Sequence, residues 1–140
     1  MKFINSETNK DYGFSMVGVE NKGYTYWGKA RLHPDDEWSE FFGCRLAEMR
    51  AKISALKDEH REAKARCEEC RKFVEAVKQY KNFDPESPTA KAMFRQLNRR
   101  IVAVNRIAEE IAALELEIIV NIKTQDEIKT RLKAKADKNN

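Results

Sequence analysis

A heptad stripe in the middle of the chain limits what this chain can fold into. From Phe42 to Val77, mainly apolar residues recur at alternating spacings of three and four, which places them along one side of a long helix. Because an isolated amphipathic helix would leave such a stripe in water, the stripe requires a partner helix. Its positions are Phe42, Leu46, Met49, Ile53, Leu56, His60, Ala63, Cys67, Cys70, Val74 and Val77.

The last third of the chain supplies the partner. A polar run with two prolines, Asn82–Pro88, interrupts the helical pattern, and Ser87 followed by Pro88 is typical of a helix N-cap and first turn. Because the connection is short, we expect two antiparallel helices. The predicted fold is mainly α, with a long helical hairpin (coiled coil) at residues 35–136 whose helices cover about 36–81 and 88–134.

The second predicted helix carries more apolar groups than one neighbour can cover. A helix apolar on several sides is usually buried by several neighbours, so we predict a homodimer whose hairpins form a four-helix bundle. The alternative is that the N-terminal strands fold onto the same surface. The seam predicted for this helix contains Phe94, Leu97, Ile101, Val104, Ala108 and Ile111. The predicted dimer core contains Ile101, Val104, Ile107, Ile111, Leu114, Ile118 and Ile122.

The N-terminal segment favours a β-hairpin at residues 12–33, preceded by an unpatterned, flexible arm at residues 1–11. Alternation over 12–20 and an aromatic-rich return strand flank a three-residue connection, Asn21-Lys22-Gly23, in which Gly23 suits a left-handed conformation. A two-stranded hairpin is marginal in water, so it should pack on the start of the first helix. The nearest apolar residues of that helix are Trp38, Phe41 and Phe42. The N-cap of the helix is either Asp35 or Ser39.

Composition favours a helical interaction protein of one domain. The 140 residues include 36% charged residues but only 5 Gly and 3 Pro, which is typical of long solvent-facing helices. No stretch has the length and apolarity of a membrane span, and the first residues lack a signal-peptide pattern, so we expect a cytoplasmic protein without membrane partners. An odd number of cysteines, 3, favours reduced thiols.

One segment carries a family resemblance. The run from Gly28 to Trp38, with His33-Pro34-Asp35-Asp36-Glu37 at its centre, is followed by Gly43–Ala51. These residues resemble a strand-turn-helix module that recurs in small accessory proteins of phages and mobile elements of Gram-positive bacteria, over about residues 13 to 51. The resemblance implies an origin in such an element, and it assigns no functional residue. This chain departs from the short form by continuing into two long helices.

Few residues offer chemistry. Cys67 and Cys70 lie one helical turn apart and resemble half of a zinc or redox site, but both occupy stripe positions, where a small buried residue is wanted. His60 lies on the same stripe, where a polar residue more often fixes register, and His33 is followed by two acids in a turn. No phosphate loop, nucleophile elbow or zinc-protease motif is present. We therefore expect no metal, no cofactor and no enzymatic activity.

A basic segment is the best candidate for binding. Residues 71 to 100 include eight cations but only three anions, with aromatic residues among them. Both arms of the hairpin would contribute to one positive end, which we call the basic tip. The alternative is an ordinary solvated helix surface whose aromatic residues pack the end of the hairpin. Such a surface suits phosphates, and its aromatic side chains suit bases or a protein pocket. The residues of the basic tip are Arg71, Lys72, Lys78, Lys81, Lys91, Arg95, Arg99, Arg100, Tyr80 and Phe83.

Three functions remain open at this point. In the first, the chain is a non-enzymatic phage or mobile-element protein that binds and inhibits a host protein such as a defence nuclease, as anti-CRISPR proteins do. In the second, the basic tip binds DNA or RNA directly, in an accessory role. In the third, the chain is a structural coiled-coil component. Salt dependence of binding and the fate of a captured partner after nuclease digestion would separate the first two.

Overall fold

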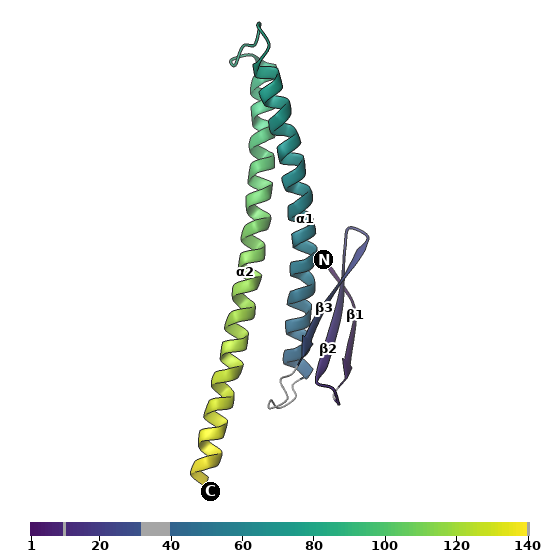
Figure 1. Ribbon diagram of the computed structural model, residues 1–140, viewed down its shortest axis with the longest axis vertical. Coiled ribbons are helices and arrows are strands. Elements are labelled where there is room, and N and C mark those ends of the chain that lie inside the picture. Colours follow the sequence, from purple (N-terminus) through teal and green to yellow (C-terminus); the bar gives the residue numbers. More distant parts are fainter. Residues whose placement is uncertain (10, 32–39, 140) are drawn as a thin grey trace. The chain divides into compact units, whose positions relative to one another are not determined.

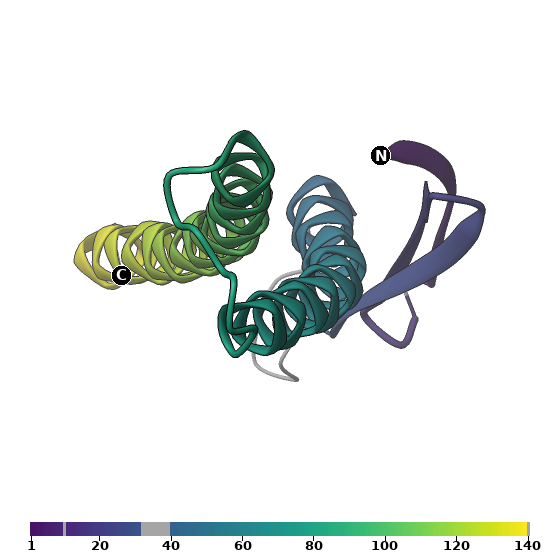
Figure 2. The same cartoon turned by 90° about the horizontal axis from the view of Figure 1, so that it is seen from above.

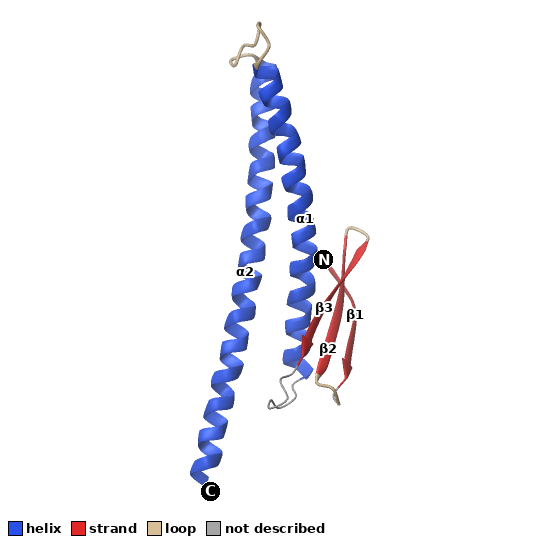
Figure 3. Ribbon diagram, viewed as in Figure 1, coloured by secondary structure: helices blue, strands red, loops and turns tan. Residues whose placement is uncertain are grey.

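The computed structural model describes residues 1–9, 11–31 and 40–139, and these residues form an N-terminal sheet and two long helices (Figures 1 and 3). They divide into two compact units, Met1–Ile53 with Ala112–Asn140, and Ser54–Ile111. The elements in chain order are β1 (Lys2–Asn9), β2 (Phe14–Asn21), β3 (Tyr24–Arg31), α1 (Glu40–Lys78) and α2 (Pro88–Asn139). The predictions made for His33, Asp35, Asp36, Trp38 and Ser39 lie outside the described residues.

The strands form one antiparallel sheet in the order β1-β2-β3, rather than the two-stranded hairpin predicted. Residues Lys2–Asn9, which the sequence suggests are an arm, pair with β2 along their length. All eight side chains of β1 are exposed. Because neither face of β1 is buried, its sequence has no reason to alternate, and the strand is held mainly by its backbone hydrogen bonds to β2.

The turn between β2 and β3 has two residues rather than three. Asn21 pairs with Tyr24, so Lys22 and Gly23 alone make the connection. Both have positive φ, 53° and 82°, which is the conformation of a type I′ hairpin turn. The prediction that Gly23 adopts a left-handed conformation is therefore confirmed.

The sheet packs on the start of α1, beside which it lies in Figures 1 and 2. Gly28 makes the approach possible, because a Cβ at this position would overlap the carbonyl oxygen of Ala47 and lie 2.5 Å from the Ala51 nitrogen. Phe42 packs against this core as expected, whereas Phe41 is 77% exposed. The buried core of this unit contains Val17, Val19, Ala30, Leu46, Ala47 and Ala51, with Ile118 of α2 packed against it.

The stripe predicted for α1 is confirmed. Every one of its positions from Phe42 to Val77 is buried or half-buried, and Val74 is only 1% exposed. In the unit Ser54–Ile111, α1 runs antiparallel beside α2, and the residues of the stripe supply its packed side (Figure 1).

α2 begins where the sequence predicts. The backbone nitrogen of Ala90 donates a 3.1 Å hydrogen bond to the Ser87 hydroxyl, so Ser87 is the N-cap and Pro88 the first helical residue. The helix continues to Asn139, beyond the predicted end at residue 134. Its last residues are mostly Lys and Ala, which favour helix, and contain no Gly or Pro.

The seam predicted for α2 is partly wrong. Ile101 is 41% exposed and Ala108 is also exposed, whereas Arg100 and Ile107 are half-buried in their place. The predicted and observed seams differ by one residue at both positions. Because an arginine occupies one of the observed seam positions, the apolar pattern does not reveal the register. The half-buried seam contains Met93, Leu97, Arg100, Val104, Ile107, Ile111, Leu114 and Ile118.

Candidate functional site

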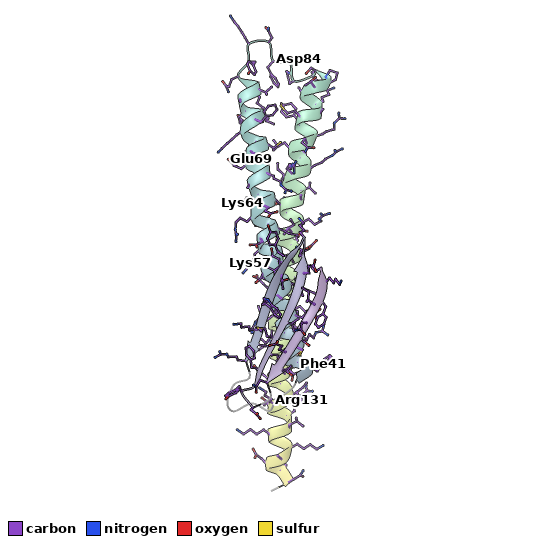
Figure 4. All side chains as sticks on the ribbon, turned by 90° about the vertical axis from the view of Figure 1, so that its right-hand side faces the viewer. Phe41, Lys57, Lys64, Glu69, Asp84 and Arg131 are labelled. Carbon is purple, nitrogen blue, oxygen red and sulfur yellow. The ribbon has the colours of Figure 1, made fainter. Side chains whose placement is uncertain are left out.

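The basic tip lies on the loop that joins α1 to α2 and on the adjoining turns of both helices, in the unit Ser54–Ile111. Asp84 of this loop is labelled in Figure 4. Phe83 meets Phe94 edge to face, with ring centroids 6.3 Å apart and an interplanar angle of 86°. The Lys78 ammonium lies 5.6 Å from the centre of the Phe94 ring. Phe83 and Lys78 therefore help to pack the end of the hairpin, which limits their part in binding.

Three cations of the basic tip have carboxylate partners within the chain. Arg71 bonds Glu68 at 2.7 Å, and this hydrogen bond lowers the pKa of Glu68 below its ordinary value of 4.5. Lys78 lies 3.6 Å from Glu75, and Lys91 lies 3.3 Å from Glu86. All three pairs are exposed, so they lower the local positive charge without adding much stability.

The other five cations of the tip form no ion pair among the described residues. Four of them, Lys72, Lys81, Arg95 and Arg99, are exposed, whereas Arg100 is half-buried in the α2 seam. From Pro88 to Ala108, α2 contains five cations and no carboxylate. Lys72 lies on α1 and Lys81 in the loop, whereas Arg95, Arg99 and Arg100 lie on α2. The first acids of α2 are Glu109 and Glu110, three and four residues after Arg106.

Three arginines share one side of α2. Arg95, Arg99 and Arg106 are spaced by four and seven residues, close to whole helical turns, and they lie opposite the half-buried seam. All three are exposed and form no ion pair among the described residues. We call these three residues the basic face. Arg106 was not predicted as a binding residue, although its distance of eleven residues from Arg95 places it on this face.

An open hollow of about 500 Å³ lies beside the loop. Its walls combine apolar side chains, including Val77, Phe83 and Met93, with polar groups of the loop. Tyr80, at its edge, is 71% exposed. The tip thus pairs one free aromatic side chain with a hollow that suits an apolar group of a partner.

Cys67 and Cys70 are not joined by further metal ligands among the described residues. Cys67 and Cys70 are free thiols and half-buried on the α1 stripe, with His60 half-buried two turns earlier. Among the described residues, no group of three or more His, Cys, Asp or Glu side chains is placed to hold a metal ion.

Most of the predicted dimer core serves the fold of the single chain. Val104, Ile107, Ile111, Leu114 and Ile118 are half-buried, and only Ile101 and Ile122 are exposed, at 41% and 37%. α2 also leaves apolar residues outside this predicted core exposed. Between Ala112 and Val120, they are Leu116 at 62%, Ile119 at 62% and Val120 at 52% exposure, which we call the open apolar face.

Within the described part of the chain, neither α1 nor α2 has a segment apolar enough to span a lipid bilayer. No protein-family model, no curated protein and no solved structure matches the chain. The resemblance of residues 13 to 51 to phage modules therefore stays a prediction.

Proposed function

We propose that this chain is a non-enzymatic accessory protein, of the phage or mobile-element type, that binds DNA or RNA through the basic face of α2. The observation that supports this proposal is the run Pro88–Ala108, which carries five cations and no carboxylate. Arg95, Arg99 and Arg106 extend over about 16 Å of helix at 1.5 Å per residue, a length that meets several phosphates of one backbone. Arginine suits this role because its planar guanidinium donates to two phosphate oxygens at once.

The test measures binding of a labelled duplex and a labelled single strand by fluorescence anisotropy. Three phosphate contacts predict that affinity falls roughly 40-fold between 50 and 200 mM salt. The variant Arg95→Gln/Arg99→Gln/Arg106→Gln should lose most of the affinity and most of the salt dependence.

A matched control removes the same charge from the same unit. Arg61, Arg66 and Arg71 of α1 each lie within 4.0 Å of a carboxylate, at 3.1, 3.9 and 2.7 Å. Replacing these three by glutamine should leave binding within about twofold, because they lie on α1 and outside the basic face of α2. Equal losses in the two triple variants would mean that net charge alone matters, and the basic face would then be rejected.

A second candidate is supported by a different observation. Tyr80 is 71% exposed at the edge of the hollow, and Tyr and Arg are the residues that most often dominate protein interfaces. In this alternative the chain binds and inhibits a host protein such as a defence nuclease. Capture from a bacterial lysate, with and without nuclease, separates the two. A stoichiometric protein that survives nuclease and is lost with Tyr80→Ala supports the inhibitor.

We also propose that the chain is a homodimer in which a second copy covers the open apolar face of α2. Leu116 and Ile119 follow Ala112 at spacings of four and three, the pattern of a seam for another helix. The most available helix with this pattern is α2 of a second copy, which would complete a four-helix bundle. Sedimentation should give twice the chain mass, and Leu116→Glu should give one. A wild-type mass of one chain would reject the dimer.

A further inference from the structure

The two faces of the sheet differ in composition. Ser15, Val17 and Val19 of β2 point toward α1 and are at most 1% exposed. The alternate residues of β2 and β3 therefore point outward, on the face that Figure 4 turns toward the viewer. Cross-strand pairing places Phe14 opposite Arg31, Met16 opposite Lys29, and Gly18 opposite Trp27. We call these outward residues, with Tyr12, the outer face.

The indole ring of Trp27 lies over Gly18 of the neighbouring strand β2. A Cβ built on Gly18 would lie 2.9 to 3.1 Å from three carbons of the Trp27 ring, so the ring occupies the space above Gly18. Glycine at this position lets the indole settle on the backbone, and Trp27 still leaves 44% of its surface exposed. A large aromatic ring supported from below and open above is a surface on which another flat ring can stack.

A hollow of about 410 Å³ lies at the other end of this face, lined by Asn9, Tyr12, Phe14 and Arg31. The Asn9 Oδ1 accepts hydrogen bonds from the backbone nitrogens of Asp11 and Tyr12, at 3.1 and 3.3 Å. These bonds position Tyr12, which is 81% exposed. The Asn9 amide nitrogen has no hydrogen-bond partner among the described residues, so it can donate to a ligand. The hollow thus combines two aromatic rings, a guanidinium and an amide donor.

We infer that the outer face binds unpaired nucleotides of single-stranded DNA or RNA, with bases stacked on Trp27 and in the Tyr12–Phe14 hollow, and phosphates at Lys29 and Arg31. Antiparallel sheets that carry aromatic rings beside cations bind single strands in this way, because every base offers a flat face. Gly18, the partner of Trp27, is four residues from Phe14 along β2, a distance of about 13 Å. This spacing leaves room for more than one nucleotide between the two stacking positions.

The charges of this face favour a polyanion on the β3 side. The side chains of Lys29 and Arg31 form no ion pair among the described residues, and Arg50 bonds only the backbone oxygen of Lys29, at 2.7 Å. Glu20 of β2 shares this face at the turn end, opposite Thr25, and Glu7 of β1 lies on the other side of Met16. Its carboxylate repels phosphate there, so the strand should follow β3. Replacing Glu7 by glutamine should tighten binding.

This inference does not depend on the basic face of α2, and the test separates them. A labelled 12-nucleotide single strand and the matching duplex are titrated with the full chain, followed by anisotropy. Tyr12→Ala and Trp27→Leu should each weaken single-strand binding roughly 5-fold to 100-fold, as expected for the loss of one stacked base. The leucine keeps an apolar cover on Gly18, and Tyr12 lies outside the paired strands, so neither change removes the sheet.

Tyr24→Ala is the matched control. Tyr24 is also on β3 and is 69% exposed, but it lies at the turn with its side chain on the opposite face. It should leave single-strand affinity unchanged. The same titrations are repeated with Arg95→Gln/Arg99→Gln/Arg106→Gln, which removes the basic face of α2. In this background, equal losses in Tyr24→Ala and Trp27→Leu, equal affinity for duplex and single strand, or no binding of the single strand would each overturn the inference.

Fluorescence gives a direct readout of stacking. The chain has 2 tryptophans, so Trp38→Phe makes Trp27 the only indole. A single strand that stacks on Trp27 quenches its emission, and this quenching should persist in Arg95→Gln/Arg99→Gln/Arg106→Gln. Quenching that disappears with those three arginines would assign the single strand to α2 and reject the outer face. Binding through α2 can fail while the outer face still quenches, so the two proposals fail separately.

Discussion

The carbonyl oxygen of Ala47 occupies the space into which a side chain at Gly28 would project. Gly28→Ala should therefore push β3 away from α1 and lower the free energy of unfolding by about 1–3 kcal/mol, the usual cost of overpacking. Chemical denaturation followed by circular dichroism measures this change. Thr25→Ala on the same strand is exposed and should change stability by less than about 0.5 kcal/mol. Equal effects would mean that Gly28 tolerates a side chain.

Ser15 is fully buried, and its hydroxyl has no hydrogen-bond partner among the described residues. A buried hydroxyl without a partner costs about 1–3 kcal/mol, so Ser15→Ala should raise the free energy of unfolding by a similar amount. Ser6→Ala on the exposed strand β1 is the control and should have little effect. A loss of stability in Ser15→Ala would show that the hydroxyl is bonded in solution.

Ile107 and Ile101 test the register of the α2 seam. Ile107 is half-buried and Ile101 is 41% exposed. Truncation of Ile107 to alanine should cost about 1–2 kcal/mol, less than for a fully buried isoleucine, and truncation of Ile101 should cost less. Thermal unfolding of both variants at one chain concentration provides the comparison. A larger cost at Ile101 would support the register first predicted from the sequence.

The Glu68 carboxylate accepts a hydrogen bond from Arg71, and this bond is the main cause of the lowered pKa of Glu68. A group with a lowered pKa in the folded state adds stability above its unfolded pKa, near 4.5, and loses it as the pH falls through the folded pKa. Arg71→Gln should return the pKa of Glu68 toward its ordinary value. Carboxyl-carbon NMR titration measures this directly. An unchanged pKa would mean that the pair does not persist in solution.

The regular part of this fold could be predicted from the sequence. The α1 stripe from Phe42 to Val77 is regular because one neighbour covers one side of the helix, and Ser87 and Pro88 mark the start of α2 by local chemistry alone. Periodicity was less reliable where Arg100 replaces an apolar seam residue, because a long side chain can be half-buried along its methylenes with its charge outside.

The missed features follow from long-range contacts. Strand β1 has no buried face, so its pairing with β2 leaves no mark on its side chains. The close approach of Gly28 to Ala47 depends on where α1 lies, which no local pattern encodes. For the candidate sites, the sequence identified the cations and aromatics of the tip, but not which cations have carboxylate partners. It also left Arg106 and the outer face of the sheet unassigned.

The exposure of β1 makes this strand the part of the sheet most prone to local unfolding. Within the described part of the chain, the β1 backbone pairs only with β2, and no side chain of β1 is buried, so opening this strand exposes little apolar surface. In native-state hydrogen exchange, the β1 amides bonded to β2 should therefore lose protection well before those that link β2 to β3. The sheet would then keep its packed β2–β3 half while its first strand detaches and re-forms.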